Sequence, residues 1–309
     1  MYEYNETDIK KMKNILIIGC GLLGSSLVRR IKKKKIAKNI FIYEKSKSNI
    51  AKIKKSKLPG RVVKSLKEGV VNSDLIIFCT PMSEYKNIIL KINNFIPLKT
   101  LITDIGSSKI ETSKIMNKFL KKGVHWIQSH PIAGSEVSGP EHGKENLFID
   151  RWCIIIKEKN TLKSNINVLI RFWKKIGSKV VVMDAEKHDK IFSITSHLPH
   201  LIAYNLVKSA QDFEKKQSYG LIKYSAGGLR DFSRIAASNE IMWRDIFFNN
   251  SNNISKAIDL FIKNLNQFKK DINSKNNKSI MKKLIKTKKV RSKIIKLKQD
   301  IDKPDFGRN

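Results

Sequence analysis

The chain has 309 residues, of which 62 are lysine or arginine, 27 are aspartate or glutamate and 41% are hydrophobic. This composition is sufficient for a packed core and about two domains, which excludes a disordered chain and a collagen-like repeat. The sequence has no apolar run of roughly 18 residues and no apolar segment near its start, so we expect neither a membrane span nor a signal peptide. We therefore expect a cytoplasmic location.

The start of the chain and its cysteines predict little chemistry. Residues 1–12 are expected to be a flexible extension, because Met12, directly before the first predicted strand, is an equally suitable start. The three cysteines Cys20, Cys79 and Cys153 are odd in number, far apart and flanked by apolar residues. This pattern predicts buried thiols rather than disulfides or metal ligands.

The formal net charge of +35 raises the hypothesis of nucleic acid binding. Only ten basic residues are arginine, the residue best suited to paired hydrogen bonds with phosphates and bases. The densest segment, 275–298, has eleven basic residues and no acid. Its apolar residues recur at helical spacing, namely Ile280, Met281, Leu284, Ile285, Ile294 and Ile295. We therefore expect a basic helix within 275–309 that packs its apolar stripe on the protein, with a nucleic acid or anionic membrane-surface arm as the alternative. The positive field would also attract small polyanionic metabolites.

Short β-rich segments alternate with helical patterns over the first 180 residues. They lie at 14–18, 39–43, 74–79, 100–104, 124–128, 152–156 and 179–183. Consecutive apolar residues predict strands buried on both faces, hence a mostly parallel sheet covered by helices. We expect an α/β, Rossmann-like, doubly wound dinucleotide-binding domain over 13–184, then an all-helical domain over 185–274 for substrate binding and dimerisation.

A glycine-rich motif, Gly19-Cys20-Gly21-Leu22-Leu23-Gly24, lies between the first strand and the first helix. Gly19 allows a tight turn, Gly21 lets the backbone approach a pyrophosphate, and Gly24 lets the helix pack on the strand. Glu44, at the end of the second strand, is placed to accept the ribose hydroxyls, which favours NAD. Lys45 and Lys47 leave NADP open. The expected cofactor residues are Gly19, Gly21, Leu22, Leu23, Gly24, Glu44, Thr80 and Pro81.

Two polar clusters follow strands at the carboxyl edge of the sheet, where such folds bind their ligands. Asp104–Lys109 contains Ser107, and Ser129–Glu136 contains His130 before a proline. A neutral imidazole can accept a hydroxyl proton while hydride leaves the same carbon. We therefore predict His130 as the base and Ser107 as a hydrogen-bond partner of the substrate or of the nicotinamide.

The helical half contains three further histidines and a local enrichment of arginine. His188, His197 and His200 lack an acid or cysteine at ligand spacing, so we expect no metal. The three arginines lie within 230–244, and arginine binds carboxylates with paired hydrogen bonds. For Arg230 and Arg244 we favour ion pairs with the neighbouring Asp231 and Asp245.

With these residues in place, the chain resembles the prephenate/arogenate (cyclohexadienyl) dehydrogenase family of tyrosine biosynthesis. The resemblance rests on blocks in a specific order: GCGLLGSS, DIGSSK, SHPIAGSE, SHLPH, then GGLRDFSRIAAS with MWRD. It implies NAD-dependent oxidative decarboxylation of a cyclohexadienol to 4-hydroxyphenylpyruvate or tyrosine, by a homodimer whose helical domains pair.

The resemblance also implies roles for single residues. His130 would act as base and Ser107 would position the hydroxyl, while Arg234 would bind a substrate carboxylate. His200 would contact the substrate, and Glu136, Trp243 and Asp189 match positions that contact or shape the pocket. No chorismate mutase or ACT segment is visible in this sequence, so we expect a monofunctional enzyme.

Three alternatives stay open at this point. Prephenate carries two carboxylates and suits the basic field, whereas the ammonium group of arogenate would need an acid such as Asp189 or Glu136. A dehydrogenase of the β-hydroxyacid type would also combine a Rossmann-like and a helical half, with a catalytic lysine in the latter. A basic protein that binds nucleic acids or anionic surfaces through 275–298 is the third hypothesis.

Overall fold

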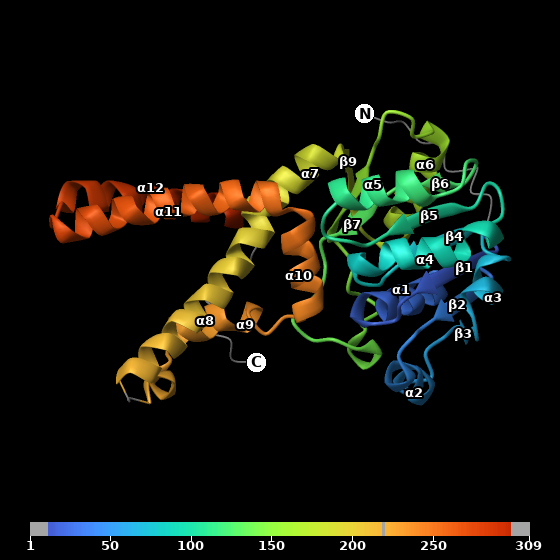
Figure 1. Ribbon diagram of the computed structural model, residues 1–309, viewed down its shortest axis with the longest axis horizontal. Helices are drawn as coiled ribbons and strands as arrows, with labels where there is room; N and C mark the ends of the chain where they lie inside the picture. Colours follow the sequence, from blue (N-terminus) through green and yellow to red (C-terminus); the bar gives the residue numbers. More distant parts are fainter. Residues whose placement is uncertain (1–11, 218–219, 298–309) are drawn as a thin grey trace. The chain divides into compact units, whose positions relative to one another are not determined.

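The computed structural model describes residues 12–217 and 220–297, so residues 1–11 and 298–309, parts of the predicted extension and tail, lie outside the described residues. The chain forms two compact units (Figure 1). The first extends to His197 and includes Ala237–Ser251, and the second comprises Leu198–Ala236 and the chain from Asn252 onward. The first unit thus contains two helices, α7 (Ala185–Phe192) and α10 (Glu240–Asn249), from the stretch that we assign to the helical domain.

A six-stranded parallel sheet forms the centre of the first unit. Its order is β3-β2-β1-β4-β5-β6, which confirms the predicted Rossmann-like fold. The strands are β1 (Asn14–Ile18), β2 (Asn39–Tyr43), β3 (Arg61–Val62), β4 (Leu75–Phe78), β5 (Leu101–Asp104) and β6 (His125–Trp126). Every residue of β4 and β5 is buried, as the consecutive apolar pattern predicts. The two-residue strand β3 was not predicted, because it is too short to carry a pattern.

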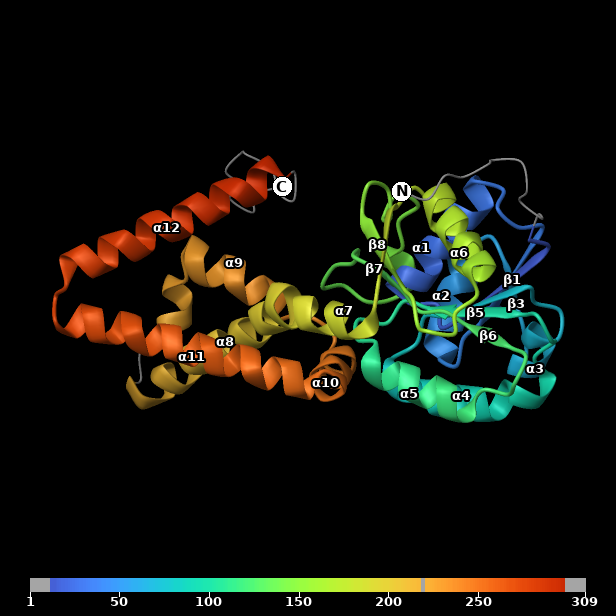
Figure 2. The ribbon, with the colours of Figure 1, turned by 90° about the horizontal axis from the view of Figure 1, so that it is seen from above.

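Helices cover both faces of this sheet. They are α1 (Leu22–Lys33), α2 (Lys47–Lys55), α3 (Leu66–Val70), α4 (Tyr85–Ile92), α5 (Ile110–Phe119) and α6 (Lys163–Ile176). Figure 2 shows α4 and α5 along one face and α1 and α6 on the other. In α6, Ile166, Leu169, Ile170 and Trp173 recur at helical spacing and are buried, so that face packs into the core. The helix ends at Gly177, which has a left-handed φ of 107°.

A second, three-stranded sheet carries His130. It consists of β7 (Ser129–Pro131), β8 (Trp152–Ile156) and β9 (Lys179–Met183), with β7 antiparallel to β8 and β8 parallel to β9. The sequence pattern placed the segments 152–156 and 179–183 in the main sheet, which is wrong, and it did not predict that Ser129–Pro131 form a strand. The Ile127 amide still donates to Ile102 of the first sheet, but from Ser129 the chain pairs with β8. Three polar or cyclic residues carry no strand pattern, so the switch is invisible in the sequence.

Short helical segments connect these elements. They are η1 (Met82–Glu84), η2 (Asn93–Phe95), η3 (Pro140–His142) and the π-helical turn η4 (Ser193–His197).

Asp184 accepts a hydrogen bond from the Lys187 amide at 2.7 Å and so caps α7. The Asp245 carboxylate accepts one from the Ser83 amide at 2.9 Å and ties α10 to η1.

The second unit is helical. It contains α8 (Leu198–Gln217), η5 (Leu221–Tyr224), α9 (Gly227–Ile235), most of α11 (Ser251–Asn273) and α12 (Asn277–Lys296). The Asp271 carboxylate accepts from Ser279 Oγ at 2.6 Å and from Lys283 Nζ, and these contacts hold the turn between α11 and α12. Within the described ranges, no helix has the length and apolar character needed to cross a bilayer.

The predicted basic helix exists as α12, but its expected packing is wrong. The helix buries none of its residues, and Leu284 and Ile285 are each 50% exposed. Figure 2 shows α12 diverging from α11 beyond their connecting turn. Most of the apolar stripe of α12 is therefore exposed, and Ile280 and Ile295 are only partly covered by the described chain.

Candidate active site

The glycine-rich turn lies where the strand order reverses, between β1 and β4, which is the ligand crevice of such sheets. Gly19 has a φ of +88°, and a Cβ there would lie 2.9 Å from the carbonyl carbon of Cys79. A Cβ at Gly24 would lie 2.3 Å from the Gly19 oxygen. Both positions therefore require glycine, one for the turn and one for the contact between helix and strand.

Several features next to this turn fit a dinucleotide. A Cβ at Gly21 would meet no atom within 4 Å, and no side chain caps the start of α1. The Glu44 carboxylate accepts from the Cys20 amide at 2.8 Å and the Ser46 amide at 2.9 Å, which fixes it at the end of β2. The buried Thr80 Oγ1 has no hydrogen-bond partner within the described part of the chain. Open space, free helix amides and a fixed carboxylate are the groups that hold a pyrophosphate and a ribose.

The other predicted cofactor residues flank the same turn. Leu22 and Leu23 are half-buried in the first turn of α1, and Pro81 is exposed directly after Thr80. Their contribution to cofactor binding stays a prediction.

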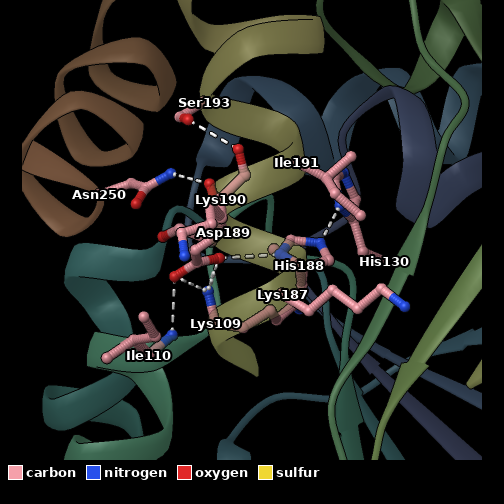
Figure 3. A network of polar contacts seen from close by, with 12 residues as sticks. Lys109, Ile110, His130, Lys187, His188, Asp189, Lys190, Ile191, Ser193 and Asn250 are labelled. Atoms are coloured by element: carbon pink, nitrogen blue, oxygen red, sulfur yellow. Dashed lines mark hydrogen bonds and ion pairs between the residues drawn. The ribbon is translucent and has the colours of Figure 1, made fainter. Parts of the chain in front are cut away.

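His130 lies on β7, is 7% exposed, and is the first member of a row of polar contacts (Figure 3). Its Nδ1 is 2.8 Å from Nε2 of His188 on α7. The other nitrogen of His188, Nδ1, is 2.8 Å from Oδ1 of Asp189. The Phe192 ring packs against both imidazoles, with centroid distances of 4.9 Å to His130 and 4.5 Å to His188.

Asp189 is fully buried and completes this row. Its carboxylate accepts from the Lys109 amide at 2.9 Å and from the Ile110 amide at 3.0 Å, both at the start of α5. Since α5 has no cap from its own side chains, a residue 80 positions away caps it. Our expectation that Asp189 contacts substrate is corrected by this geometry, because both oxygens already bind protein donors and the side chain is inaccessible.

A buried ion pair supports the same region from the other side. Lys109 Nζ is 2.9 Å from Asp104 Oδ2 and donates to the Ser129 carbonyl at 2.7 Å, with both charged side chains fully buried. The Tyr85 hydroxyl donates a hydrogen bond to the Asp104 carboxylate at 3.0 Å, and the Ser129 amide donates another at 3.1 Å. Because Ser129 directly precedes His130, this cluster fixes the position of the imidazole relative to β5.

Burial keeps the histidines neutral. It lowers the pKa of His130 well below its usual 6.5, and the neighbouring His188, Lys109 and His197 lower it further. Burial also lowers the pKa of His188, although the hydrogen bond to Asp189 opposes the shift. Near neutral pH, both imidazoles therefore carry a single proton.

These shifts predict that acid destabilises the protein. Below about pH 6.5 the unfolded chain binds protons at His130 and His188, whereas the folded chain does not yet do so. The free energy of unfolding therefore keeps its full value above that pH and falls as the pH drops below it. Urea unfolding at about pH 7.5 and 5.5 measures the loss. The variant His130→Gln with His188→Gln should lose less stability over this range, and an unchanged loss would contradict the assignment.

Asn250, the residue directly after α10, connects that helix to the row of polar contacts. Asn250 Nδ2 donates to the Asp189 carbonyl at 2.8 Å and lies 3.1 Å from His197 Nδ1. The buried Trp243 ring packs edge-on against His197 at 6.2 Å. Trp243 thus lies in the same unit as His130, and its part in shaping the pocket stays a prediction.

The remaining predicted substrate residues are distributed over both units. Ser107 is half-buried between β5 and α5, and Glu136 is partly buried in the loop after β7. His200 on α8 and the exposed Arg234 on α9 belong to the second unit. Their roles also stay predictions.

The ion pairs that we favoured for the other two arginines are confirmed. Arg244 Nη2 is 2.7 Å from Asp245 Oδ1, and Arg230 Nε is 3.7 Å from Asp231 Oδ1. Among the described residues, no three histidine, cysteine or acidic side chains gather as a metal site.

Sequence reasoning missed the supporting residues of this site, which are Tyr85, Asp104, Lys109, His188 and Asn250. Asp104 and Lys109 were visible only as the ends of DIGSSK. The available signal for His188 was its spacing from Phe192, which places both on one helix face together with an acid. An apolar face that includes a histidine and an aspartate indicates buried polar partners.

A parallel sheet of this order, a glycine turn at its switch point and a buried, neutral histidine define a dinucleotide-dependent oxidoreductase with a Rossmann-like half and a helical half. The nucleotide-binding domain of prephenate dehydrogenases matches residues 27–182, and their dimerization domain matches residues 184–287. The chain belongs to the prephenate dehydrogenase family.

Similar proteins span nearly the whole chain. A cyclohexadienyl dehydrogenase from Zymomonas mobilis is 31% identical over 94% of this chain and 98% of its own length. A prephenate dehydrogenase from Lactococcus lactis is 33% identical over 87% and 74%, respectively. The structure of the Aquifex aeolicus prephenate dehydrogenase with hydroxyphenyl propionate and NAD+ matches with a TM-score of 0.85 at 31% identity, covering 92% of this chain and 98% of that one.

The β-hydroxyacid alternative receives less support. A 3-hydroxyisobutyrate dehydrogenase from Mycobacterium tuberculosis is 12% identical with a TM-score of 0.50, a likeness that extends to the fold alone. The family match therefore favours the cyclohexadienol substrate class.

Proposed function

We propose that this chain oxidises and decarboxylates a cyclohexadienol, prephenate or arogenate, with NAD as the hydride acceptor. The observation that carries the proposal is the buried, neutral His130, held through Nδ1 by His188 in a fold with a dinucleotide turn. The named relatives, one of which binds NAD+ and hydroxyphenyl propionate, support the same reaction.

His130 acts as the base in this reaction. Its Nε2, the nitrogen not used in the contact with His188, accepts the proton of the ring hydroxyl. Gly19, Gly21 and Glu44 would hold NAD, which would supply the acceptor for the hydride of the carbinol carbon. The bond between the ring and its carboxylate then breaks, carbon dioxide leaves, and the electron pair completes the aromatic ring as a phenolate. The phenolate oxygen regains the proton held by His130, which restores the neutral base. Because His130 is neutral near pH 7, it can take up the proton without first losing one.

The substrate carboxylate is proposed to bind Arg234, with His200 as a second contact and Ser107 orienting the hydroxyl. Glu136 and Trp243 are proposed as further residues that contact the substrate. Of the two acids considered for the ammonium group of arogenate, Asp189 is committed to α5 and His188, so Glu136 is the remaining partner.

Arg234→Gln is expected to act on substrate binding. Loss of a desolvated arginine–carboxylate pair should cost about 2–5 kcal/mol, seen as a higher KM for the substrate with an unchanged Kd for NAD. Steady-state kinetics measures the effect. Arg230→Gln is the matched control, because Arg230 lies on the same helix, is exposed and pairs with Asp231. A fall in kcat at unchanged KM would contradict the binding role.

We also propose a cytoplasmic homodimer that pairs through the second unit. The match to a dimerization domain supports this, as do the large apolar side chains that the single chain leaves exposed. On α11 and α12 these are Leu260, Ile262, Leu265, Ile272, Met281, Leu284, Ile285, Val290, Ile294 and Leu297. An apolar stripe of this kind favours a protein partner over a nucleic acid partner for α12.

A substrate and cofactor matrix tests the proposed function. Prephenate, arogenate and 3-hydroxyisobutyrate are each offered with NAD+ and with NADP+, and reduced cofactor is followed by absorbance. We expect turnover with a cyclohexadienol substrate and NAD+. Turnover of 3-hydroxyisobutyrate alone would overturn the proposal. A preference for NADP+ would indicate that Lys45 and Lys47 bind the 2′-phosphate of that cofactor.

A further inference from the structure

The row from His130 to Asp189 fixes where each proton lies. Backbone amides of Lys109 and Ile110 donate to the Asp189 carboxylate, so this group acts as an acceptor. His188 Nδ1, 2.8 Å from Oδ1, must then be the donor in that contact.

The single proton of neutral His188 is therefore on Nδ1, which leaves its Nε2 as an acceptor. His130 Nδ1 lies 2.8 Å from that nitrogen and must carry the proton between them. The remaining nitrogen of His130, Nε2, then has a free lone pair.

We propose that His188 and Asp189 are positioning residues that hold His130 in the tautomer protonated on Nδ1, so that Nε2 faces the reaction as a base. The inference rests on the proposed function for its catalytic meaning, but the tautomer itself is a property of the free protein. The opposite tautomer would present an N–H to the substrate hydroxyl and could not remove its proton.

The surroundings hold this arrangement in place. His188 and Asp189 are fully buried neighbours on α7, and the Phe192 ring packs against both imidazoles. When His130 Nε2 accepts the substrate proton, its positive charge is shared through Nδ1–H with His188 and with the negative carboxylate beyond it. A serine protease uses an aspartate to orient its histidine in a comparable way.

Nitrogen NMR of the substrate-free protein, with ¹⁵N-labelled histidine, tests the tautomer directly. We expect the His130 signals of an imidazole protonated on Nδ1, assigned by their loss in His130→Asn. Signals of a ring protonated on Nε2 would overturn the inference. This readout needs no substrate, so a correct tautomer without turnover of prephenate or arogenate would count against the proposed function alone.

Asp189→Asn should reverse donor and acceptor in both hydrogen bonds that connect residue 189, His188 and His130. The new amide oxygen is needed by the two backbone amides, so its NH₂ group faces His188 Nδ1. The His188 proton then moves from Nδ1 to Nε2, from which it is donated to His130 Nδ1, and the His130 proton moves to its Nε2. We expect kcat to fall about 10²–10⁴-fold with the NMR signature reversed and the Kd of NAD unchanged.

The matched control for this variant is Asp184→Asn, which changes the exposed cap of the same helix and should keep both kcat and the tautomer. An Asp189→Asn variant that folds and keeps wild-type kcat would overturn the inference.

Because Asp189 also caps α5, a second pair of variants leaves it intact. His188→Gln can still offer an amide oxygen to His130 Nδ1–H, whereas His188→Leu cannot. We expect the kcat of the glutamine variant to be about 10-fold or more above the kcat of the leucine variant. A difference of this size is typical of groups that orient an active residue. Equal activity in both variants would show that His188 only fills space and would refute the positioning role.

Discussion

His130→Asn is expected to lower kcat by about 10²–10⁴-fold, the usual contribution of a general base. Asparagine is smaller than histidine and its amide nitrogen can still donate to His188, but it has no nitrogen that takes up a proton near neutral pH. The loss should therefore appear in kcat, while the Kd of NAD, which depends on the glycine turn and Glu44, stays unchanged. Steady-state kinetics and a cofactor titration measure the two quantities separately.

His125→Asn provides the control. His125 lies on β6 in the same unit, is half-buried, and takes no part in the polar row. This variant should keep the wild-type kcat. If His130→Asn also did so, His130 would not be the base, whatever its geometry.

Lys109→Met is expected to lower the free energy of unfolding by about 3–5 kcal/mol, because it leaves the fully buried Asp104 without its counter-charge. The Ser129 carbonyl loses a hydrogen bond at the same time. Methionine matches the length of the lysine stem, so lost packing contributes little. Urea unfolding of both proteins measures the difference.

Lys114→Met is the matched control for this variant. Lys114 lies on the same helix, α5, and pairs with Glu111, but its side chain is 67% exposed. Exposed pairs of this kind contribute only about 0–1 kcal/mol. Equal destabilisation by the two substitutions would contradict the structural role that we assign to Lys109.

The sequence predicted the elements whose patterns are long or chemically specific. Residues 75–78 are consecutively apolar, and residues 101–104 are so apart from Thr103 and Asp104, so this pattern predicted their burial in a parallel sheet. The turn from Gly19 to Gly24 was recognisable because each glycine was assigned its own steric reason, and the reasons for Gly19 and Gly24 hold in the structure, while that for Gly21 stays a prediction. His130 stood out because a histidine before a proline follows a strand.

The sequence did not predict contacts that depend on distant elements meeting. Asp189 reaches the start of α5 across 80 residues, and nothing local distinguishes it from an acid that binds substrate. The same holds for β7, where three residues form a strand only because β8 lies beside them. Burial is also what lowers the pKa of His130 and His188, and burial depends on the fold as a whole.

The ratio of carbon dioxide to NADH formed from the preferred cyclohexadienol substrate tests the central claim most directly. Oxidation that leads to aromatisation predicts one carbon dioxide released for each NADH, with an aromatic product. NADH formed with the ring carboxylate retained, or carbon dioxide released without NADH, would contradict the account.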